Sequence, residues 1–173
     1  GVSFKINISD NDLRGNLLGS LEGKVLSSKV KLNFSYDTKS IEISNLYFRD
    51  QKVSLDSNGF LKFKPFFIIS LNSKIKDVDL KSLRNLDLAS LLKFQSLIKR
   101  MNSKNVITFN RNKFSNSLVS NLQLKINLAH GRLDILKNFK IENSNFICQK
   151  NINLLDEYPI LYFNCTIDSP DIK

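Results

Sequence analysis

Apolar and polar residues alternate along most of this chain. In residues 29–36, Val30, Leu32 and Phe34 occupy every second position, and polar residues such as Lys31 and Asn33 lie between them. A period of two is typical of β-strands with one apolar face, and it favours antiparallel strands over the continuous apolar runs of buried parallel sheets. The pattern recurs as far as residues 161–167 and predicts about ten or eleven strands. Turn signals separate them at Asp37-Thr38, Asn58-Gly59, Lys64-Pro65, His130-Gly131 and Asp156-Glu157.

The strand pattern occurs twice, first from about Lys29 to Leu80 and again from about Gln123 to Ile172. Residues 31–34, Lys-Leu-Asn-Phe, are matched by Lys-Ile-Asn-Leu at residues 125–128, and Pro65 is matched by Pro159. Such a repeat is typical of a supersecondary unit that stacks beside its copy and extends a continuous surface. We therefore predict one domain, with a first repeat at about 13–85, a helical connector at about 86–103 and a second repeat at about 104–173.

One amphipathic helix is predicted between the repeats, at about residues 87–101. Asp87 can cap its start. The helix would pack on the sheet as a connector, or cover an apolar groove as a lid. Its apolar stripe consists of Leu88, Leu91, Leu92, Phe94, Ile98 and Met101.

Three glycines near the N-terminus, Gly15, Gly19 and Gly23, recur every four residues. This spacing occurs in dimers of membrane helices, but here charged residues lie among the glycines. We interpret the segment as strands that bend or bulge.

The chain carries a formal charge of +10, which raises the question of an anionic partner. Lys outnumbers Arg 20 to 6, and many lysines fall on the polar side of predicted strands, as on a solvated surface. A denser basic group fits either a solvated surface or contact with anionic lipid head groups. Aromatic residues do not interleave with the basic ones, so we predict no nucleic-acid partner. The basic group consists of Lys99, Arg100, Lys104, Arg111 and Lys113.

No apolar run reaches the roughly 18 residues that a membrane-spanning helix needs. The sequence begins with Gly1 rather than Met. We interpret it as a piece of a longer protein, from which a signal or an anchor could have been removed.

Residues for catalysis or metal binding are sparse. The single histidine, His130, precedes Gly131 in a predicted turn, and no nucleophile accompanies it. Clustered Cys and His residues for zinc do not occur. We therefore predict that the protein is not an enzyme and uses no metal or cofactor.

The apolar side of these strands is too wide for one helix to cover. Each large apolar side chain left in water forfeits on the order of 1.5–3 kcal/mol. The sheet could fold into a sandwich, close into a barrel, or curl into a trough whose lining meets an apolar ligand. The alternation does not distinguish these arrangements, because residues such as Phe34 and Phe67 suit a core and an acyl chain equally well.

Several short motifs between Asn45 and Leu83 follow one another in a recognisable order. They are Asn45-Leu46, Val53-Ser54-Leu55, Gly59-Phe60-Leu61, Pro65 and the segment Asp-Val-Asp-Leu-Lys-Ser-Leu at residues 77–83. A glycine-rich segment, Leu-Gly-Ser-Leu-Glu-Gly-Lys-Val at residues 18–25, precedes them. This order resembles the AsmA-like family of bacterial envelope proteins, which includes TamB-type and YhdP-type members. The resemblance begins at about Leu13; in the second repeat Asn151 stands near the position of Gly59, and Pro170 interrupts the closing motif.

The resemblance implies a periplasmic protein, anchored to the bacterial inner membrane, whose repeating β-groove carries phospholipids between the envelope membranes during outer membrane biogenesis. It implies a mainly β fold, with a curved antiparallel sheet or groove, and no enzymatic activity. The alternative is a closed β-sandwich that serves as a scaffold or envelope-assembly module without lipid transport. Protein partners are not indicated. The residues predicted to line the groove are Val30, Leu32, Phe34, Ile41, Ile43, Val53, Leu55, Leu61, Phe63, Phe67, Ile69, Leu71, Leu122, Leu124, Ile126, Leu128 and Phe163.

The two cysteines are placed to face each other. If Asp156-Glu157 is a hairpin turn, the numbers of paired residues sum to 313, and Cys148 stands opposite Cys165. Facing positions on adjacent strands approach disulfide distance, and the oxidising periplasm implied by the resemblance permits the bond. Two buried free thiols are the alternative, because a register error of one residue removes the pairing.

Overall fold

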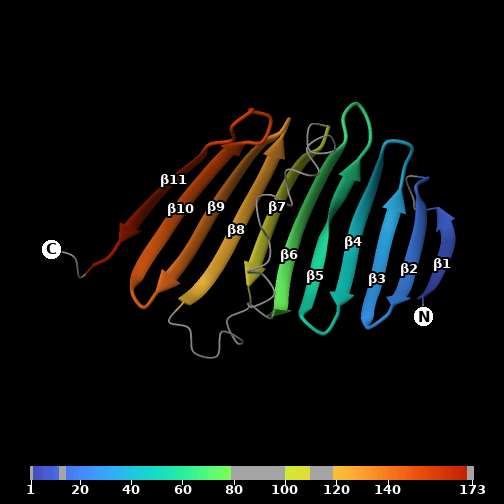
Figure 1. The fold of residues 1–173 in the computed structure, drawn as a ribbon. Coiled ribbons are helices and arrows are strands. Elements are labelled where there is room, and N and C mark those ends of the chain that lie inside the picture. Colours follow the sequence, from blue (N-terminus) through green and yellow to red (C-terminus); the bar gives the residue numbers. More distant parts are fainter. Residues whose placement is uncertain (1, 12–14, 79–99, 110–118, 171–173) are drawn as a thin grey trace.

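The computed structural model describes residues 2–11, 15–78, 100–109 and 119–170, and these form one sheet of eleven strands (Figure 1). The strands lie side by side in chain order, from β1 at one edge to β11 at the other. The predicted mainly β fold is confirmed. The strands are β1 (Val2–Asn11), β2 (Leu17–Val25), β3 (Ser28–Tyr36), β4 (Ser40–Arg49), β5 (Val53–Lys62), β6 (Ile68–Val78), β7 (Asn102–Phe109), β8 (Val119–Ala129), β9 (Arg132–Ile141), β10 (Ser144–Asn153) and β11 (Leu161–Asp168).

Neighbouring strands are antiparallel except for β6 and β7, which are parallel. The prediction of an antiparallel sheet is therefore confirmed for most of the sheet and wrong at this one pair. A parallel pair needs a connection of a dozen or more residues, because the chain must return to the end where the first strand began. The chain between Val78 and Asn102 is long enough for such a crossover.

The predicted helix at 87–101 falls on this crossover. Residues 87–99 lie outside the described residues, whereas Arg100 is in a turn and Met101 has no regular structure. Asn102 and Ser103, predicted as the end of the helical connector, belong to β7. No helix occurs among the residues that the structure describes, so none of them forms a helix that could cross a membrane.

Asn58-Gly59 was predicted to be a turn, and this prediction is wrong. Both residues lie inside β5, where Gly59 pairs with Leu71 of β6. Gly59 has φ of 152°, and a Cβ atom there would lie 1.9 Å from the carbonyl oxygen of Ser70. The glycine therefore permits close approach of two backbones within a strand rather than a reversal of the chain.

Two aspartates order the turns on either side of β4. The Oδ1 atom of Asp37 accepts hydrogen bonds from the backbone N–H groups of Lys39 (2.6 Å) and Ser40 (2.5 Å). These bonds stabilise the carboxylate, so the pKa of Asp37 lies below its ordinary value. Asp50 accepts two backbone hydrogen bonds in the same way after β4, and its pKa is lowered for the same reason.

Gly19 and Gly23 do not mark bulges, contrary to the interpretation from sequence. Both lie within a regular stretch of the β2–β3 ladder. A Cβ atom on Gly19 would come within 2.5 Å of the Phe34 ring, and one on Gly23 within 2.6 Å of the Phe4 ring. The missing side chains thus make room for aromatic rings from the neighbouring strands.

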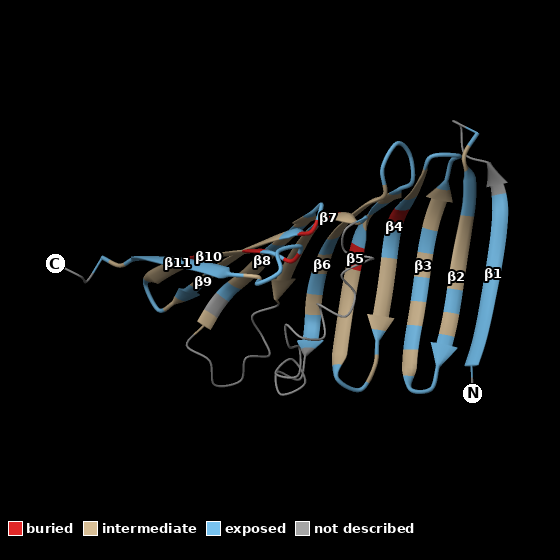
Figure 2. Cartoon of the chain, turned by 45° about the horizontal axis from the view of Figure 1, so that its top comes forward, coloured by how far each residue is buried: buried red, intermediate tan, exposed pale blue. Residues whose placement is uncertain are grey.

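The sheet is a single layer that is neither closed nor strongly curled. It twists along its width, so that in Figure 2 β2–β5 present a face while β8–β11 are seen almost edge-on. The sandwich and barrel arrangements are therefore wrong for the described strands, all of which belong to one open sheet. These strands also do not form a deep trough by themselves.

The two passes of the sequence repeat fall on β3–β6 and β8–β11. Lys31-Leu32-Asn33-Phe34 lies in β3 and its match at residues 125–128 lies in β8. Pro65 and Pro159 follow β5 and β10 respectively. The domain boundaries proposed from the repeat stay a prediction.

Candidate functional site

The two faces of the sheet differ in chemistry. Side chains alternate between faces along each strand, and paired residues of neighbouring strands share a face. The register therefore assigns Val30, Leu32 and Phe34 to the same face as Leu46, Ile43 and their partners across the sheet. We call this the apolar face. Its large apolar residues are Val2, Phe4, Ile6, Ile8, Leu17, Leu21, Val25, Val30, Leu32, Phe34, Tyr36, Ile41, Ile43, Leu46, Phe48, Val53, Leu55, Leu61, Ile69, Leu71, Ile75, Ile107, Phe109, Leu124, Ile126, Leu128, Leu133, Ile135, Phe139, Ile141, Phe146, Ile152, Leu161, Phe163 and Ile167.

The structure brings most of the predicted lining residues together on this face. Phe63 and Phe67 instead lie in the connection between β5 and β6, where their rings stack with centroids 6.2 Å apart. Leu122 lies where the β8–β9 register shifts. None of the predicted lining residues lies on β1, although apolar and polar residues alternate along residues 2–8 as well.

No described layer covers the apolar face, and the apolar residues at its two edges are exposed to solvent. On β1, Val2, Phe4, Ile6 and Ile8 are 60–69% exposed, and on β11 Phe163 is 60% exposed. Only four apolar residues of the described chain are buried, namely Ile43, Cys148, Ile152 and Leu154. Figure 2 shows how little of the sheet is buried. Large exposed apolar patches are typical of interaction sites, so this face is the candidate functional surface of the described strands.

One corner of the apolar face is covered locally. The backbone N–H of Leu154, just after β10, donates a hydrogen bond to the Gly131 carbonyl (2.9 Å). This places Leu154, which is 1% exposed, against Ile152, Leu128 and Leu133. The β10–β11 connection thus builds a small core over the ends of β8–β10.

A polar group interrupts the apolar face near its centre. Ser57 and Ser73 pair across β5 and β6, with 2.9 Å between their hydroxyl oxygens. Ser103 and Asn105 of β7 share their face. Ser57 and Ser103 are buried, and within the described residues the Oδ1 atom of Asn105 is buried without a hydrogen-bond partner. The grouping of these polar residues depends on the register between strands β5, β6 and β7.

Two lysines lie among the apolar residues. Lys137 of β9 and Lys150 of β10 are on the apolar face by register. Their ammonium groups lie 4.6 Å from the centroid of the Phe139 ring and 5.2 Å from that of the Phe163 ring. A ring face attracts a cation, which keeps these charges close to the apolar surface. Sequence reasoning missed both residues, because it read lysines as belonging to the polar side.

The basic group predicted to contact lipid head groups is only partly placed. Lys99, Arg111 and Lys113 lie outside the described residues. Arg100 is exposed in the turn before β7, and Lys104 is exposed on β7. Lys104 pairs with Ser70 and Asn127, so it lies on the face opposite the apolar one.

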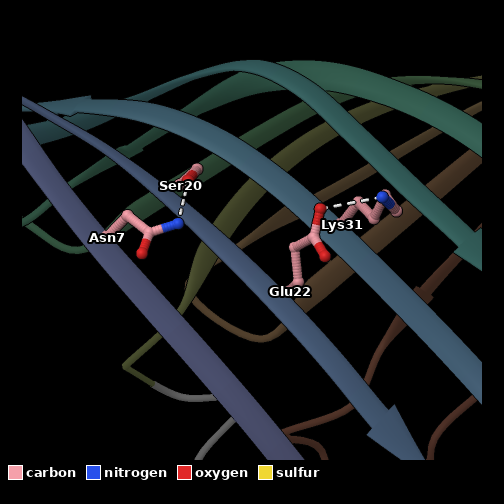
Figure 3. Close-up of polar contacts among 4 residues, drawn as sticks. All are labelled: Asn7, Ser20, Glu22 and Lys31. Carbon is pink, nitrogen blue, oxygen red and sulfur yellow. Dashed lines mark hydrogen bonds and ion pairs between the residues drawn. The ribbon is translucent and has the colours of Figure 1, made fainter.

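That opposite side, the polar face, carries short side-chain contacts between strands. Figure 3 shows two of them: Asn7 Nδ2 to Ser20 Oγ (3.5 Å) and Lys31 Nζ to Glu22 Oε1 (2.8 Å). The hydrogen bond and charge of Lys31 hold the pKa of Glu22 below its ordinary value. A shallow hollow of about 520 Å³ lies on the same side, between Asn7, Ser20 and Ser44. These features are those of a hydrated surface.

The residues that the sequence offers for catalysis or metal binding do not form a cluster within the described part of the chain. His130 lies in the β8–β9 turn, where its backbone N–H donates to Asn102 Oδ1 (3.2 Å). Across the described ranges, no group of three His, Cys, Asp or Glu residues could hold a metal ion.

Cys148 and Cys165 face each other on β10 and β11 and form a disulfide, with sulfur atoms 1.97 Å apart. The observed register is the one predicted from the hairpin at Asp156-Glu157. The bond lies on the apolar face and ties the edge strand β11 to the sheet.

Comparisons of the chain with protein-family models, with curated proteins and with solved structures found no match. The resemblance to the AsmA-like family therefore stays a prediction that depends on the sequence motifs.

Proposed function

We propose that the apolar face binds the acyl chains of phospholipids and conducts them along the sheet, without catalysis. The observation that carries the proposal is the broad apolar face of an open single-layer sheet, exposed at both edges. An acyl chain laid on such a face removes apolar surface from water on both partners, which is favourable by about 25 cal/mol per Å². The face would act as one wall of a β-groove.

Two lysines suit the head-group end of a phospholipid. Lys137 and Lys150 place ammonium groups beside Phe139 and Phe163, within reach of a phosphate whose acyl chains lie on the same face. We prefer them to Lys104, which projects from the polar face.

The proposed setting is the periplasm of a bacterial envelope, with the full-length protein anchored to the inner membrane. The family resemblance supports this setting, and the Cys148–Cys165 disulfide agrees with an oxidising compartment. Protein partners are not part of the proposal.

Photo-crosslinking at adjacent positions tests lipid binding. A photoreactive amino acid at Leu32 projects from the apolar face, and the same residue at Lys31 projects from the polar face. After expression in bacteria, we expect phospholipid adducts at position 32 and not at position 31, detected by mass spectrometry. Equal labelling at both positions, or none at either, would refute the proposal.

A charge on the apolar face provides a second test. Leu124→Asp should reduce co-purified phospholipid while the protein stays folded, because position 124 is only partly buried. Gln123→Asp, on the polar face, should leave the lipid content unchanged. If Leu124→Asp unfolds the protein, the face is sealed in solution, as in the scaffold alternative.

A further inference from the structure

Within the described residues the sheet ends at two edge strands, β1 and β11, on opposite sides (Figure 1). Among the described residues no strand pairs with the outer edge of either. Native proteins usually protect such edges with proline, lysine or bulges. β1 contains one lysine and no proline, and its single irregularity is at its C-terminal end; β11 contains neither lysine nor proline. These edges are therefore open to pairing with another strand.

The directions of the two edge strands are complementary. Strands β1 to β6 alternate in direction, the parallel pair β6–β7 repeats one direction, and β7 to β11 alternate again. As a result β11 runs opposite to β1. A second molecule placed beside the first in the same orientation would present its β1 antiparallel to β11, with its apolar face on the same side.

The hydrogen-bond phase of β1 follows from the β2–β3 hairpin. Val25 and Ser28 flank the two-residue turn Leu26-Ser27, which places them in a hydrogen-bonded pair. Because antiparallel pairs alternate, the even-numbered residues of β2 then bond to the odd-numbered residues of β1. The backbone groups of Val2, Phe4, Ile6 and Ile8 therefore point outward from the edge.

The phase of β11 follows from the disulfide and from the neighbouring hairpin. Cys148 and Cys165 have Cα atoms 4.1 Å apart, the short spacing of a pair without backbone hydrogen bonds. The two-residue turn between Ile141 and Ser144 gives the same phase through β9 and β10. The backbone groups of the odd-numbered residues of β11 therefore point outward, and these residues also lie on the apolar face.

We propose that β11 of one molecule adds to β1 of a second copy of this chain, in antiparallel register and head to tail. Direction, hydrogen-bond phase and side-chain alternation of the two edge strands are complementary, so a second copy of this chain can pair at either edge. The interface is heterologous, so repeated addition extends one continuous apolar face. The proposal does not depend on lipid. The register that pairs all four outward residues sets Val2 opposite Ile167, Phe4 opposite Cys165, Ile6 opposite Phe163 and Ile8 opposite Leu161.

Proline variants at the two edges test the proposal. Ile6→Pro and Phe163→Pro each remove an outward N–H group and leave the hydrogen bonds within the sheet intact. We expect the unaltered chain to associate with rising concentration in sedimentation velocity, and each proline variant alone to be monomeric. An equimolar mixture should form a dimer and nothing larger, because each variant keeps one competent edge. Ile6→Val and Phe163→Leu, which retain the N–H group, should associate like the unaltered chain.

A disulfide across the proposed junction tests the register and needs no proline. Ser3→Cys in one molecule and Thr166→Cys in another would face each other on the polar side, whereas Ser9→Cys would lie six residues out of register. We expect a covalent dimer from Ser3→Cys with Thr166→Cys, and none from Ser9→Cys with Thr166→Cys. The proposal would be overturned if the unaltered chain stayed monomeric at all concentrations, or if both proline variants still associated. Equal covalent dimer from the Ser3→Cys and Ser9→Cys pairings would also overturn it. Retained association in the proline variants would indicate packing of apolar faces instead.

Discussion

An open apolar face predicts that similar aliphatic residues contribute very differently to stability. Leu154 is 1% exposed within the small core over β8–β10, whereas Ile8 on β1 is 69% exposed. Truncating a buried leucine to alanine costs about 2–5 kcal/mol, because it removes contacts and leaves a cavity. Ile8 has about a third of its surface buried, so Ile8→Ala should cost roughly a third of the full 1.5–3 kcal/mol, or about 0.5–1 kcal/mol.

Equilibrium urea unfolding followed by far-UV circular dichroism measures both costs. With a total stability of about 5–15 kcal/mol, Leu154→Ala should lower the unfolding midpoint markedly and Ile8→Ala only slightly. Phe146→Ala, partly buried on the same face, should fall between them. The measurement should be repeated at several protein concentrations, because association through β1 would bury Ile8.

The reasoning would be refuted if Ile8→Ala cost as much as Leu154→Ala at the lowest protein concentration. Ile8 would then be covered within a single molecule, and β1 would not be a free edge of an open face. A small cost at Ile8 that grows with protein concentration would instead support pairing at that edge.

Three further predictions concern the disulfide, a glycine and a turn. Replacing Cys148 and Cys165 together with serine should lower the unfolding free energy by about 3 kcal/mol, since the bond spans 17 residues; two alkylatable thiols in the unreduced protein would exclude the bond. Gly59→Ala should cost more than Gly15→Ala in urea unfolding, because both glycines have positive φ but only Gly59 faces a backbone clash; equal costs would contradict the close approach. The pKa of Asp37 is below its ordinary value of 3.8, so its stabilising effect is present above that pH and is lost as the pH falls through the folded-state pKa. Asp37→Asn should therefore be less stable than the unaltered chain at pH 7, and the difference should shrink in acid; a difference independent of pH would contradict the assignment.

Sequence alone indicated most of the strands and which side of each of these strands is apolar. These properties depend on a period-two pattern within a few neighbouring residues, so the assignment of Leu32 and Phe34 to one face did not need the fold. The pairing of Cys148 with Cys165 was also accessible, because one tight turn sets the register of its two strands.

Only the tertiary structure decided how the strands meet. The parallel pair β6–β7 depends on a long crossover, which no local pattern encodes. The predicted turn at Gly59 and the predicted bulges at Gly19 and Gly23 were wrong, because each glycine makes room for a group on a neighbouring strand. That group is a backbone carbonyl at Gly59 and an aromatic ring at Gly19 and Gly23.

The candidate site also combines features that the sequence predicts with features that only the tertiary structure reveals. Its aliphatic lining could be predicted, whereas the polar group at Ser57, Ser103 and Asn105 and the two lysines at Lys137 and Lys150 could not, because they join the apolar face only through pairing across several strands. Whether the face is sealed or open was likewise undecided by alternation, since a period of two is the same in a sandwich and in a single sheet. The tertiary structure places the described strands in one open layer, because each strand hydrogen-bonds only to its neighbours and no second described layer packs on the apolar side.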